Sequence, residues 1–411
     1  MRLTKLFTKT SKTAPAGETS KNAQLLTRAG YIHKEMAGVY AYLPLGIRVI
    51  ENIKQIVREE MNAIDGQELI MTALQPNDLW EATDRWDKSK VDIWFKTELA
   101  AGGEVGLAPT HEEPITNMLR RFVSSYKDLP INVYQFETKF RNELRAKSGI
   151  MRGREFLMKD LYSFSRSQEE HDAYYEKAAA AYTRVFERLE IGDDTYKTFA
   201  SGGVFSKFSH EYQTLLPVGE DTIYMNADKS IAINEEVFND EVIAEFGAKR
   251  EDFTAHTAAE VGNIFTLGQK YSEPLGLEFT GEDGLRRFVC MGCYGIGITR
   301  CMGVIAEKFA DDKGLVWPEA VAPFKYYLVA IGEAGAKVAD ELYDAHPDLF
   351  LYDDRDARVG EKFADSELLG IPYRVVISDK TLEGSQVELT TRRTGDTKLL
   401  TLDEFRATLG E

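Results

Sequence analysis

The sequence is poor in cysteine: its three cysteines, Cys290, Cys293 and Cys301, stand close together in the last third of 411 residues. So few thiols exclude a disulfide framework and favour a reducing compartment, which we expect to be the cytoplasm. No apolar run approaches the roughly 18–20 residues that cross a membrane, and residues 1–20 lack the apolar core of a signal peptide. We therefore expect no membrane partner, and we expect residues 1–20 to form a loose or extended arm.

Positive charge is also scarce, because 50 lysines and arginines oppose 67 acidic residues and leave a formal net charge of −17. This balance argues against a polybasic membrane-surface protein and, taken alone, against a nucleic-acid partner. Hydrophobic residues make up 43% of the chain and charged residues 28%, which excludes a disordered chain. At roughly 100–200 residues per domain, the length predicts two or three domains.

The pattern of apolar residues changes near residues 317–323, where two prolines follow a predicted helix. Before this point the expected strands follow one another without regular helical crossovers, which favours an antiparallel or mixed sheet flanked by helices. Beyond it, predicted strands and helices alternate at 326–331, 334–345, 349–352, 361–369 and 373–377, with further strands at 387–391 and 398–402. We expect one domain over residues 1–320 and a small α/β domain over 325–411.

Local signals predict several elements of the first domain. Apolar periodicity indicates a helix from Pro44, a strand follows at 68–71, and a hairpin pairs 92–99 with 103–107. Thr110 and Glu113 form the T-x-x-E capping box that we expect to open a helix over 110–126. Ser167 is expected to cap a helix that continues to Leu189.

The densest chemical signal is the stretch 139–166, where eight lysines and arginines stand against three acidic residues. Two predicted strands, 131–141 and 156–165, are joined there by a polar loop. Arginine can grip a phosphate through two hydrogen bonds, and strand alternation should put Arg141 and Glu143 on one face of the sheet. The pattern predicts a polyanion site in which Glu143 accepts a hydrogen bond from an exocyclic amine. The alternative is a solvated hairpin with a charged tip.

A second signal lies at residues 291–300, where Gly295 and Gly297 precede a predicted helix. Two glycines allow a tight turn and a close backbone approach. Arg300 would stand in the first turn of the helix, where a cation opposes the helix dipole, so an anionic ligand beside it is favoured. The alternative is a surface arginine beside a glycine-rich packing corner. Neither a G-x-G-x-x-G fingerprint nor a P-loop occurs in the chain.

Three weaker signals remain. Glu112 stands near a predicted helix start, where a carboxylate could hold an ammonium group. His210 and Glu211 stand together within residues 206–212. The C-x-x-C pair that ends at Cys293 lacks the second pair of ligands that a structural zinc site usually has, so buried cysteines beside a glycine turn are favoured over zinc.

Together these motifs resemble, in order and spacing along essentially the whole chain, those of the prolyl-tRNA synthetases of class II in their bacterial form. Residues 45–76, 139–165 and 291–305 are similar to class II motifs 1, 2 and 3, residues 109–112 to the T-x-E proline loop, and residues 353–372 to the anticodon-binding domain. The resemblance implies an α+β fold, in which an antiparallel sheet flanked by helices forms the catalytic domain and an α/β anticodon-binding domain follows.

The resemblance also implies the reaction. Proline and ATP, with Mg²⁺, would form prolyl-adenylate and pyrophosphate, and the prolyl group would then pass to the 3′ end of tRNA(Pro). The implied partners are tRNA(Pro), L-proline, ATP and a second copy of the chain in a homodimer. Chemistry at the α-phosphate agrees with the residues present, since it needs positioning and charge neutralisation rather than a protein nucleophile.

The family's site residues are carried over position by position. ATP would be bound by Arg141, Glu143, Arg152, Phe156 and Arg300, of which Arg141 and Arg300 are expected to act in catalysis. Glu143 would read the adenine amine, and Phe156 would stack on adenine opposite Arg300. Proline would be bound by Thr110, Glu112, Arg141, Met158, Asp160, Tyr162, His210 and Cys293. Arg145 would reach the tRNA acceptor stem, and no protein ligand of Mg²⁺ is assigned.

Two departures from the family pattern matter. Thr72 stands where a proline usually ends motif 1, although Pro76 and the preceding helix remain, so we expect dimerisation to survive. Only a short stretch separates residues 224–233 from 261–272, where many bacterial members carry a large editing domain. We therefore expect a synthetase without cis-editing.

Two alternatives stay open. A class II synthetase for another small amino acid, such as threonine or serine, is the first, because apolar pockets discriminate by only about 1–3 kcal/mol per methylene. A non-catalytic tRNA-binding protein on a synthetase scaffold is the second, although such proteins usually lose the ATP arginines, which remain here. The basic stretch 139–166 removes the objection from net charge, because tRNA needs local phosphate contacts rather than a basic chain.

Overall fold

The computed structural model describes residues 1–203 and 208–410, and the chain divides into two compact units. The core unit contains Ala37–Val39 and Lys54–Val304, and the terminal unit contains Met1–Met36, Tyr40–Ile53 and Ile305–Glu411. Within the described residues, no helix is long and apolar enough to cross a membrane.

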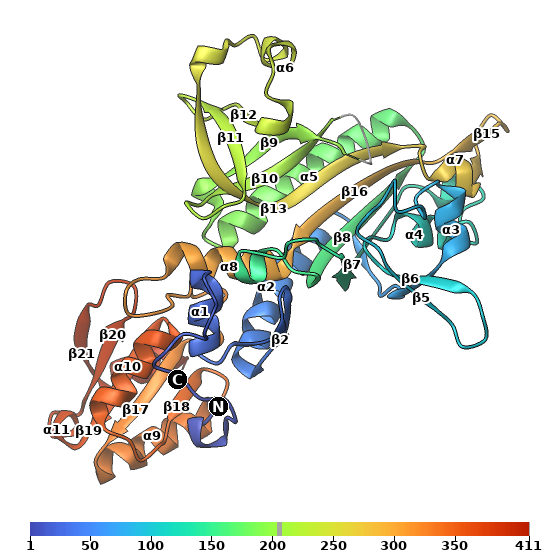
Figure 1. The fold of residues 1–411 in the computed structure, drawn as a ribbon. Helices are drawn as coiled ribbons and strands as arrows, with labels where there is room; N and C mark the ends of the chain where they lie inside the picture. Colours follow the sequence, from blue (N-terminus) through green and yellow to red (C-terminus); the bar gives the residue numbers. More distant parts are fainter. Residues whose placement is uncertain (204–207, 411) are drawn as a thin grey trace. The chain divides into compact units, whose positions relative to one another are not determined.

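The core unit is built on a nine-stranded sheet with the order β10-β9-β12-β11-β13-β16-β8-β7-β3 (Figure 1). Its strands are β3 (Gln67–Glu68), β7 (Ile131–Phe140), β8 (Glu155–Ser165), β9 (Thr195–Ser201), β10 (Phe208–Leu215), β11 (Asp221–Asn226), β12 (Ala232–Asn234), β13 (Phe253–Gly268) and β16 (Cys290–Gly297). Neighbours run antiparallel except that β3 is parallel to β7 and β12 to β9. This confirms the antiparallel or mixed sheet and the strand pair expected for motif 2.

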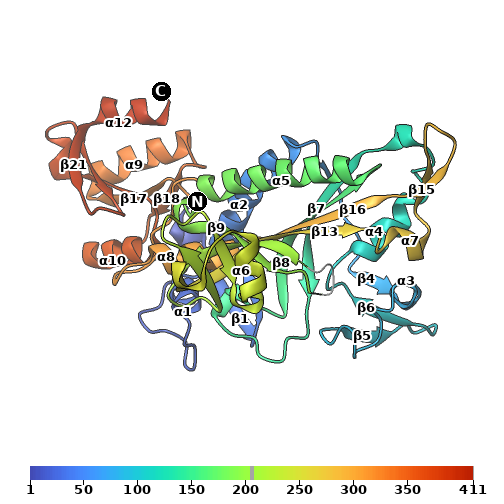
Figure 2. The same cartoon turned by 90° about the horizontal axis from the view of Figure 1, so that it is seen from above.

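One face of this sheet is covered by helices. Figure 2 shows α5 (Gln168–Arg188) running along the sheet, where it packs on β8, β13 and β16. Ser167 caps α5 as predicted, because its side chain accepts a hydrogen bond from the backbone N–H of Glu170. Lys159 of β8 points to this face and donates to the Tyr182 hydroxyl of α5 across 2.6 Å. The neighbouring residues of β8, Met158 and Asp160, therefore point to the opposite face.

A smaller sheet with the order β4-β6-β5 precedes motif 2. Its strands are β4 (Leu74–Pro76), β5 (Phe95–Glu98) and β6 (Glu104–Leu107), and α3 (Asn77–Ala82) and α4 (Glu112–Leu119) flank them in sequence. The pairing of β5 with β6 confirms the predicted hairpin. Three tryptophans, Trp80, Trp86 and Trp94, form the apolar core of this region with Val91. The rest of the unit contains α6 (Asp240–Glu245), α7 (Ser272–Leu275), β14 (Glu278–Thr280), β15 (Arg286–Phe288) and the start of α8 (Ile298–Phe309).

The terminal unit contains a five-stranded sheet with the order β18-β17-β19-β20-β21. Its elements are α1 (Lys21–Arg28), β1 (Ile32–Met36), β2 (Val39–Tyr42), α2 (Pro44–Asn62, which continues into the core unit), β17 (Tyr326–Ile331), α9 (Glu333–Ala345), β18 (Phe350–Asp353), α10 (Val359–Leu369), β19 (Tyr373–Ser378), α11 (Asp379–Leu382), β20 (Gln386–Thr391), β21 (Thr397–Thr401) and α12 (Leu402–Leu409). The alternation of strands and helices confirms the predicted α/β domain.

The first residues of the N-terminal arm, which was expected to be loose or extended, are anchored. The Met1 ammonium donates to the carbonyl of Phe350 across 2.7 Å, and Arg2 donates to Asp340 across 2.8 Å. The Thr4 hydroxyl donates to Asp354 across 2.6 Å. The first residues are therefore anchored beside β18 by charged contacts that no local sequence pattern reveals.

The predicted helix over 110–126 is also wrong in length and in its cap. α4 covers only Glu112–Leu119 and begins after His111, which makes no side-chain cap bond. The capping box does not form because both of its side chains have other partners: the Thr110 hydroxyl donates to Glu112, and the Glu113 carboxylate accepts from Arg85. The side chains at the start of α4 therefore bond to one another and to Arg85 instead of capping the backbone N–H groups of the helix.

Two further local predictions differ from the structure. The strand expected at 68–71 ends at Glu68, because the Met71 N–H donates to the side chain of Gln135 rather than to a strand neighbour. Gly295 and Gly297 lie within β16 and not in a turn. Their expected close approach is correct, since a Cβ on Gly295 would lie 2.8 Å from Oδ1 of Asn263.

Candidate active site

A cavity of about 170 Å³ at the end of β7 collects most residues that were predicted to bind ATP. Its lining includes Arg141, Glu143, Arg152 and Arg300. The expected alternation of Arg141 and Glu143 along a strand is wrong, because β7 ends at Phe140 and the Glu143 N–H donates to the Arg141 carbonyl across 2.7 Å. A turn after the strand, and not the strand itself, brings the two side chains to the cavity.

Carboxylates hold two of the arginines in place. Arg152 donates to Glu143 and to Glu220, at 3.0 Å in each case. Arg300 donates to a carboxylate oxygen of Glu260 across 2.9 Å. The carboxylate expected to read an amine is thus engaged by Arg152 in this structure.

Arg300 lies in the first turn of α8, as the sequence predicted. Its Nε donates to the Met151 carbonyl across 2.8 Å, and its Nη1 donates to the carbonyl of Glu260 across 2.7 Å. Burial and the neighbouring charge of Arg300 lower the pKa of Arg141. Two arginines that repel each other in a half-buried place favour an anion between them.

The ring of Phe156 contributes a flat apolar surface next to this cavity. It lies 5.2 Å from the Arg141 guanidinium carbon, and its predicted stacking on adenine opposite Arg300 stays a prediction. Strand alternation places Phe156 on the same face of β8 as Met158 and Asp160. An aromatic ring beside a cluster of arginines suits a ligand with a flat base and phosphates.

Two half-buried carboxylates, Glu211 and Glu260, lie close enough to affect each other. Burial, and then the charge of Glu260, raise the pKa of Glu211 to about 8. The Glu211 carboxylate accepts hydrogen bonds of 2.9 Å from Gln213 and from Asn234. A pair of repelling carboxylates beside an anion-binding cavity is a place where a divalent cation would be stabilised.

A second cavity, of about 220 Å³, shares Arg141 with the first. Val91, Ile93 and Pro109 give it apolar walls, and Thr110 and Arg85 also line it. The Arg141 Nε donates to the Pro109 carbonyl across 3.4 Å. A small apolar wall with a cation at one side suits an amino acid whose carboxylate lies at Arg141.

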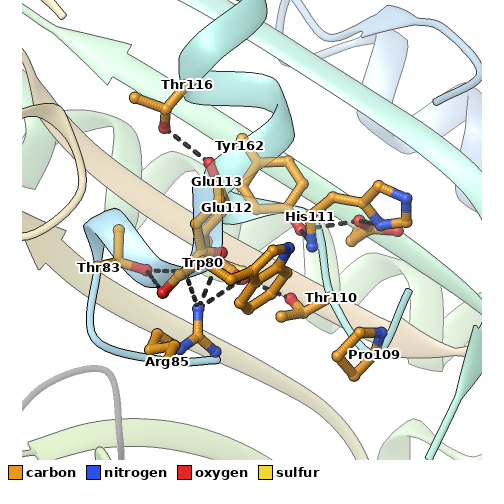
Figure 3. Close-up of polar contacts among 12 residues, drawn as sticks. Trp80, Thr83, Arg85, Pro109, Thr110, His111, Glu112, Glu113, Thr116 and Tyr162 are labelled. Carbon is orange, nitrogen blue, oxygen red and sulfur yellow. Dashed lines mark hydrogen bonds and ion pairs between the residues drawn. The ribbon is translucent and has the colours of Figure 1, made fainter. Parts of the chain in front are cut away.

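The carboxylate of Glu112 lies next to Thr110 and is fully buried (Figure 3). The Thr110 hydroxyl donates to one of its oxygens across 2.6 Å, and the Cys293 thiol donates to the other across 3.3 Å. Burial, and then the charge of Glu112, raise the pKa of the Cys293 thiol well above its usual value, so the thiol stays protonated. Both donors are neutral, and the cation of the ion pair at Glu112 is Arg85, whose Nη1 lies 3.6 Å from its nearer oxygen.

Below this loop lies a buried polar network that includes two residues predicted for the proline pocket. The Tyr162 hydroxyl donates to Asp160 across 2.8 Å and accepts from the His111 N–H across 3.1 Å. Lys139 approaches the other oxygen of Asp160 within 2.8 Å and donates to Nδ1 of His111 across 2.7 Å. Although burial raises the pKa of Asp160, the charge of Lys139 holds it below its usual value. Asp160 therefore supports the loop instead of presenting a free carboxylate.

The other predicted residues are placed differently. Met158 packs beside Gly295, with its sulfur 3.7 Å from where a Cβ of that glycine would be. His210 is not brought to this site: its Nδ1 bonds to the hydroxyl of Tyr175, a residue of α5 on the helix-covered face. Arg145 is exposed in the loop after β7. Ser206 and Lys207 of the stretch 206–212 lie outside the described residues.

Sequence reasoning missed Arg85, Lys139 and Glu260. Arg85 stands in an irregular stretch, and its partner Glu113 follows much later in the chain, so no local pattern joins them. Lys139 belongs to the basic stretch 139–166, yet its side chain is fully buried. Glu260 carried a detectable signal, because it is a charged residue inside the long apolar strand β13.

Comparisons with known proteins agree with this geometry. A sequence model of the class II tRNA synthetase core domain (G, H, P, S and T) matches residues 95–309, and one of the anticodon binding domain matches residues 320–411. Among solved structures, prolyl-tRNA synthetase from Cryptosporidium parvum complexed with L-proline and AMP has a TM-score of 0.77 and 18% identity, covering 97% of this chain and 77% of that one. Giardia lamblia prolyl-tRNA synthetase in complex with prolyl-adenylate has a TM-score of 0.76 and 18% identity, covering 92% and 74%. These neighbours share the fold.

Sequence relatives are similar over their whole length. The proline–tRNA ligase of Anaplasma phagocytophilum (strain HZ) is 36% identical, covering 98% of this chain and 98% of the relative. The proline–tRNA ligase of Gluconobacter oxydans (strain 621H) is also 36% identical, covering 100% of both chains. With this identity over nearly the full length of both partners, and with both domains matched, the chain belongs to the proline–tRNA ligase family of class II aminoacyl-tRNA synthetases.

Proposed function

We propose that this chain joins L-proline to the 3′ end of tRNA(Pro) in two ATP-dependent steps. The proline carboxylate first attacks the α-phosphate of ATP and releases pyrophosphate, and the terminal ribose of the tRNA then takes the prolyl group and releases AMP. Family membership supports the reaction. The observation that supports proline as the substrate is the cavity of about 220 Å³. It has apolar walls and is also lined by Arg141 and Thr110.

Arg141 is assigned the central role because it lines both cavities. The proline carboxylate and the α-phosphate must meet beside Arg141, and its guanidinium can neutralise both during the attack. Thr110 and Glu112 hold the imino group of proline. Cys293 and Tyr162 form the buried floor, while Met158 and Asp160 belong to its supporting wall. His210 is assigned no direct contact with proline, because its Nδ1 bonds to the Tyr175 hydroxyl.

ATP is assigned to the cavity of about 170 Å³, which is lined by more charged residues than the other cavity. Phe156 stacks on the adenine, Glu143 accepts from the adenine amine, and Arg300 approaches the phosphates. Arg152 is assigned to the outer phosphates. Because Arg152 now bonds to Glu143 and Glu220, ATP binding requires these contacts to be exchanged for contacts with the nucleotide.

Mg²⁺ is expected together with ATP. The residues present fit such an ion, because Glu211 and Glu260 offer carboxylate oxygens, the donors that Mg²⁺ prefers, and because burial and then the charge of Glu260 raise the pKa of Glu211. When bound, the ion would neutralise charge on the phosphates. Arg300, which is paired with Glu260, holds that carboxylate in position.

We assign catalysis to residues 1–320 and anticodon binding to residues 325–411. Arg145, exposed on the loop after β7, is assigned to the acceptor stem of the tRNA. We further propose a homodimer formed through motif 1, no cis-editing, and a cytoplasmic location, where its tRNA substrate is used. Three buried free cysteines agree with a reducing compartment.

The deciding experiment is amino-acid-dependent ATP–pyrophosphate exchange with the purified full chain. Exchange stimulated by proline, and much less by alanine, threonine or serine, is the expected result. Exchange with another of these amino acids would instead select a class II synthetase of different specificity. No exchange with any amino acid would select a non-catalytic tRNA-binding protein.

A further inference from the structure

Two adjacent buried carboxylates share one arginine at the start of α4. Nη1 of Arg85 lies 2.8 Å and 3.0 Å from the two carboxylate oxygens of Glu113, and 3.6 Å from the nearer oxygen of Glu112 (Figure 3). The side chain of Arg85 is 8% exposed, and those of both glutamates are 0% exposed. Water therefore contributes little to the stabilisation of these three charges.

Aromatic residues fix the position of the guanidinium. Its central carbon lies 4.8 Å from the ring centre of Trp80 and 5.3 Å from that of Tyr271. The Trp94 indole N–H donates to the backbone carbonyl of Arg85 across 3.0 Å. The tryptophan core of the small β4-β6-β5 region thus holds Arg85 against Glu113, although Arg85 belongs to no helix or strand.

The two glutamates differ in what compensates their charge. Glu113 receives both short contacts from Arg85 and a further hydrogen bond of 2.8 Å from the Thr83 hydroxyl. Glu112 receives hydrogen bonds from neutral donors, the Thr110 hydroxyl and the Cys293 thiol, and lies farther from the guanidinium. Counted as ionised, the three side chains sum to one negative charge, and Arg85 lies nearer to Glu113 than to Glu112. Glu112 is therefore less fully compensated by Arg85 than Glu113 is, and a further cation beside it would be stabilised.

We propose that Arg85 is a positioning residue for the amino-acid subsite: it neutralises Glu113 and leaves Glu112 with the single negative charge that selects a substrate carrying one cationic amine. This inference rests on the proposed function, because the cation it accommodates is the imino group of proline. Arg85 itself touches the substrate cavity but leaves the chemistry at the phosphate to Arg141. Its effect on the substrate is exerted through the charge of Glu112.

A role of Arg85 through charge predicts a result that a purely structural role of Arg85 does not predict. In Glu113→Gln the guanidinium keeps its charge and turns to Glu112, which is already 3.6 Å away, so the subsite becomes neutral. The KM for proline should then rise by about 10- to 100-fold, which corresponds to the free energy lost with one charge-assisted hydrogen bond. The KM for ATP should change little. The double variant Arg85→Met/Glu113→Gln removes one charge of each sign, restores the net negative charge, and should bring the KM for proline back towards wild type.

The test compares these variants with Arg85→Met and with wild type in ATP–pyrophosphate exchange, measuring KM for proline and for ATP separately. Arg121→Met, an exposed arginine beyond the end of α4, is the matched control and should leave both constants unchanged. An increased KM for proline in Glu113→Gln that is relieved in the double variant supports the proposal. An unchanged KM in Glu113→Gln, or additive damage in the double variant, overturns it. If wild type shows no proline-dependent exchange, the proposed function fails instead, so the two failures are distinguishable.

Discussion

Arg300, in the first turn of α8, donates a hydrogen bond of 2.9 Å to Glu260, which lies within the long strand β13. The pair closes one side of the proposed ATP cavity. It explains why an arginine stands at a helix start against the helix dipole, since the half-buried Glu260 carboxylate and the carbonyls of Met151 and Glu260 hold it there. The same arginine repels Arg141 across the cavity, and an anionic ligand would relieve that repulsion.

Arg141→Ala should lower the rate of proline-dependent ATP–pyrophosphate exchange by about a thousandfold or more, because the guanidinium neutralises the charge that develops at the α-phosphate. The loss should be seen mainly in kcat, measured at saturating proline and ATP. Arg166→Ala, an exposed residue at the end of motif 2 that pairs with Glu170, is the control and should keep wild-type exchange. Retention of more than about a tenth of the wild-type rate in Arg141→Ala would contradict the assignment.

Arg145→Ala should separate the two steps of the reaction. Its side chain is exposed on the loop after β7, so we expect exchange with proline to stay near the wild-type rate. Charging of tRNA(Pro) should fall by about 10-fold, the loss of one charge-assisted contact to a phosphate. Both rates are measured on the same preparation, and an equal loss of exchange and charging would remove the acceptor-stem assignment.

Glu211 should make the stability of the protein depend on pH. In the folded protein its pKa is about 8, because of burial and the charge of Glu260, whereas an unfolded glutamate titrates near pH 4.3. Between these values the folded state binds more protons, so this residue lowers the free energy of unfolding as pH rises from about 4 to 8.

Glu211→Gln removes this titration. The variant should match wild type near pH 4 and should be more stable by about 1–3 kcal/mol at pH 8, as measured by denaturant unfolding across this range. Glu241→Gln, which changes an exposed carboxylate, should leave the pH dependence as it is in wild type. Parallel stability curves for Glu211→Gln and wild type would show that Glu211 is already ionised in the folded protein.

The purified chain should not hydrolyse alanyl-tRNA(Pro). The residues between β11 and β13 form only β12, α6 and short turns, which leaves no room for a separate hydrolytic domain. The assay follows release of alanine from preformed alanyl-tRNA(Pro), with spontaneous hydrolysis in buffer as the reference. Release above that reference rate would end the proposal that cis-editing is absent.

Ile70 should contribute to a homodimer interface. It follows the motif 1 strand β3 at the edge of the large sheet, and its side chain is 83% exposed in the single chain. Ile70→Asp should shift the protein from dimer towards monomer in sedimentation at micromolar concentration, because burial of an isoleucine contributes about 1.5–3 kcal/mol in each copy. Val218→Asp changes another exposed apolar residue and should remain dimeric. A monomeric wild type, or an unchanged Ile70→Asp, would contradict the prediction.

Local sequence patterns were sufficient to predict those elements whose signals lie within a few residues of one another. The strands β7 and β8, the Ser167 cap of α5 and the alternation of strands and helices in the terminal unit all follow from periodicity and capping. The capping box at Thr110 failed for a specific reason. Arg85, much earlier in the chain, binds the Glu113 carboxylate, which is then not available to accept from the backbone N–H of Thr110.

By itself, the sequence determined the family, the two-domain order and the residue types that phosphate, adenine and an amino acid require, because these reside in contiguous motifs. Tertiary structure alone decided which charges compensate one another. Strand alternation sent His210 to the helix side, Lys139 became the buried partner of Asp160, and Arg85 came to lie between two glutamates. Electrostatic pairing depends on distance in space and on the loss of water around each group, and neither can be read from separation along the chain.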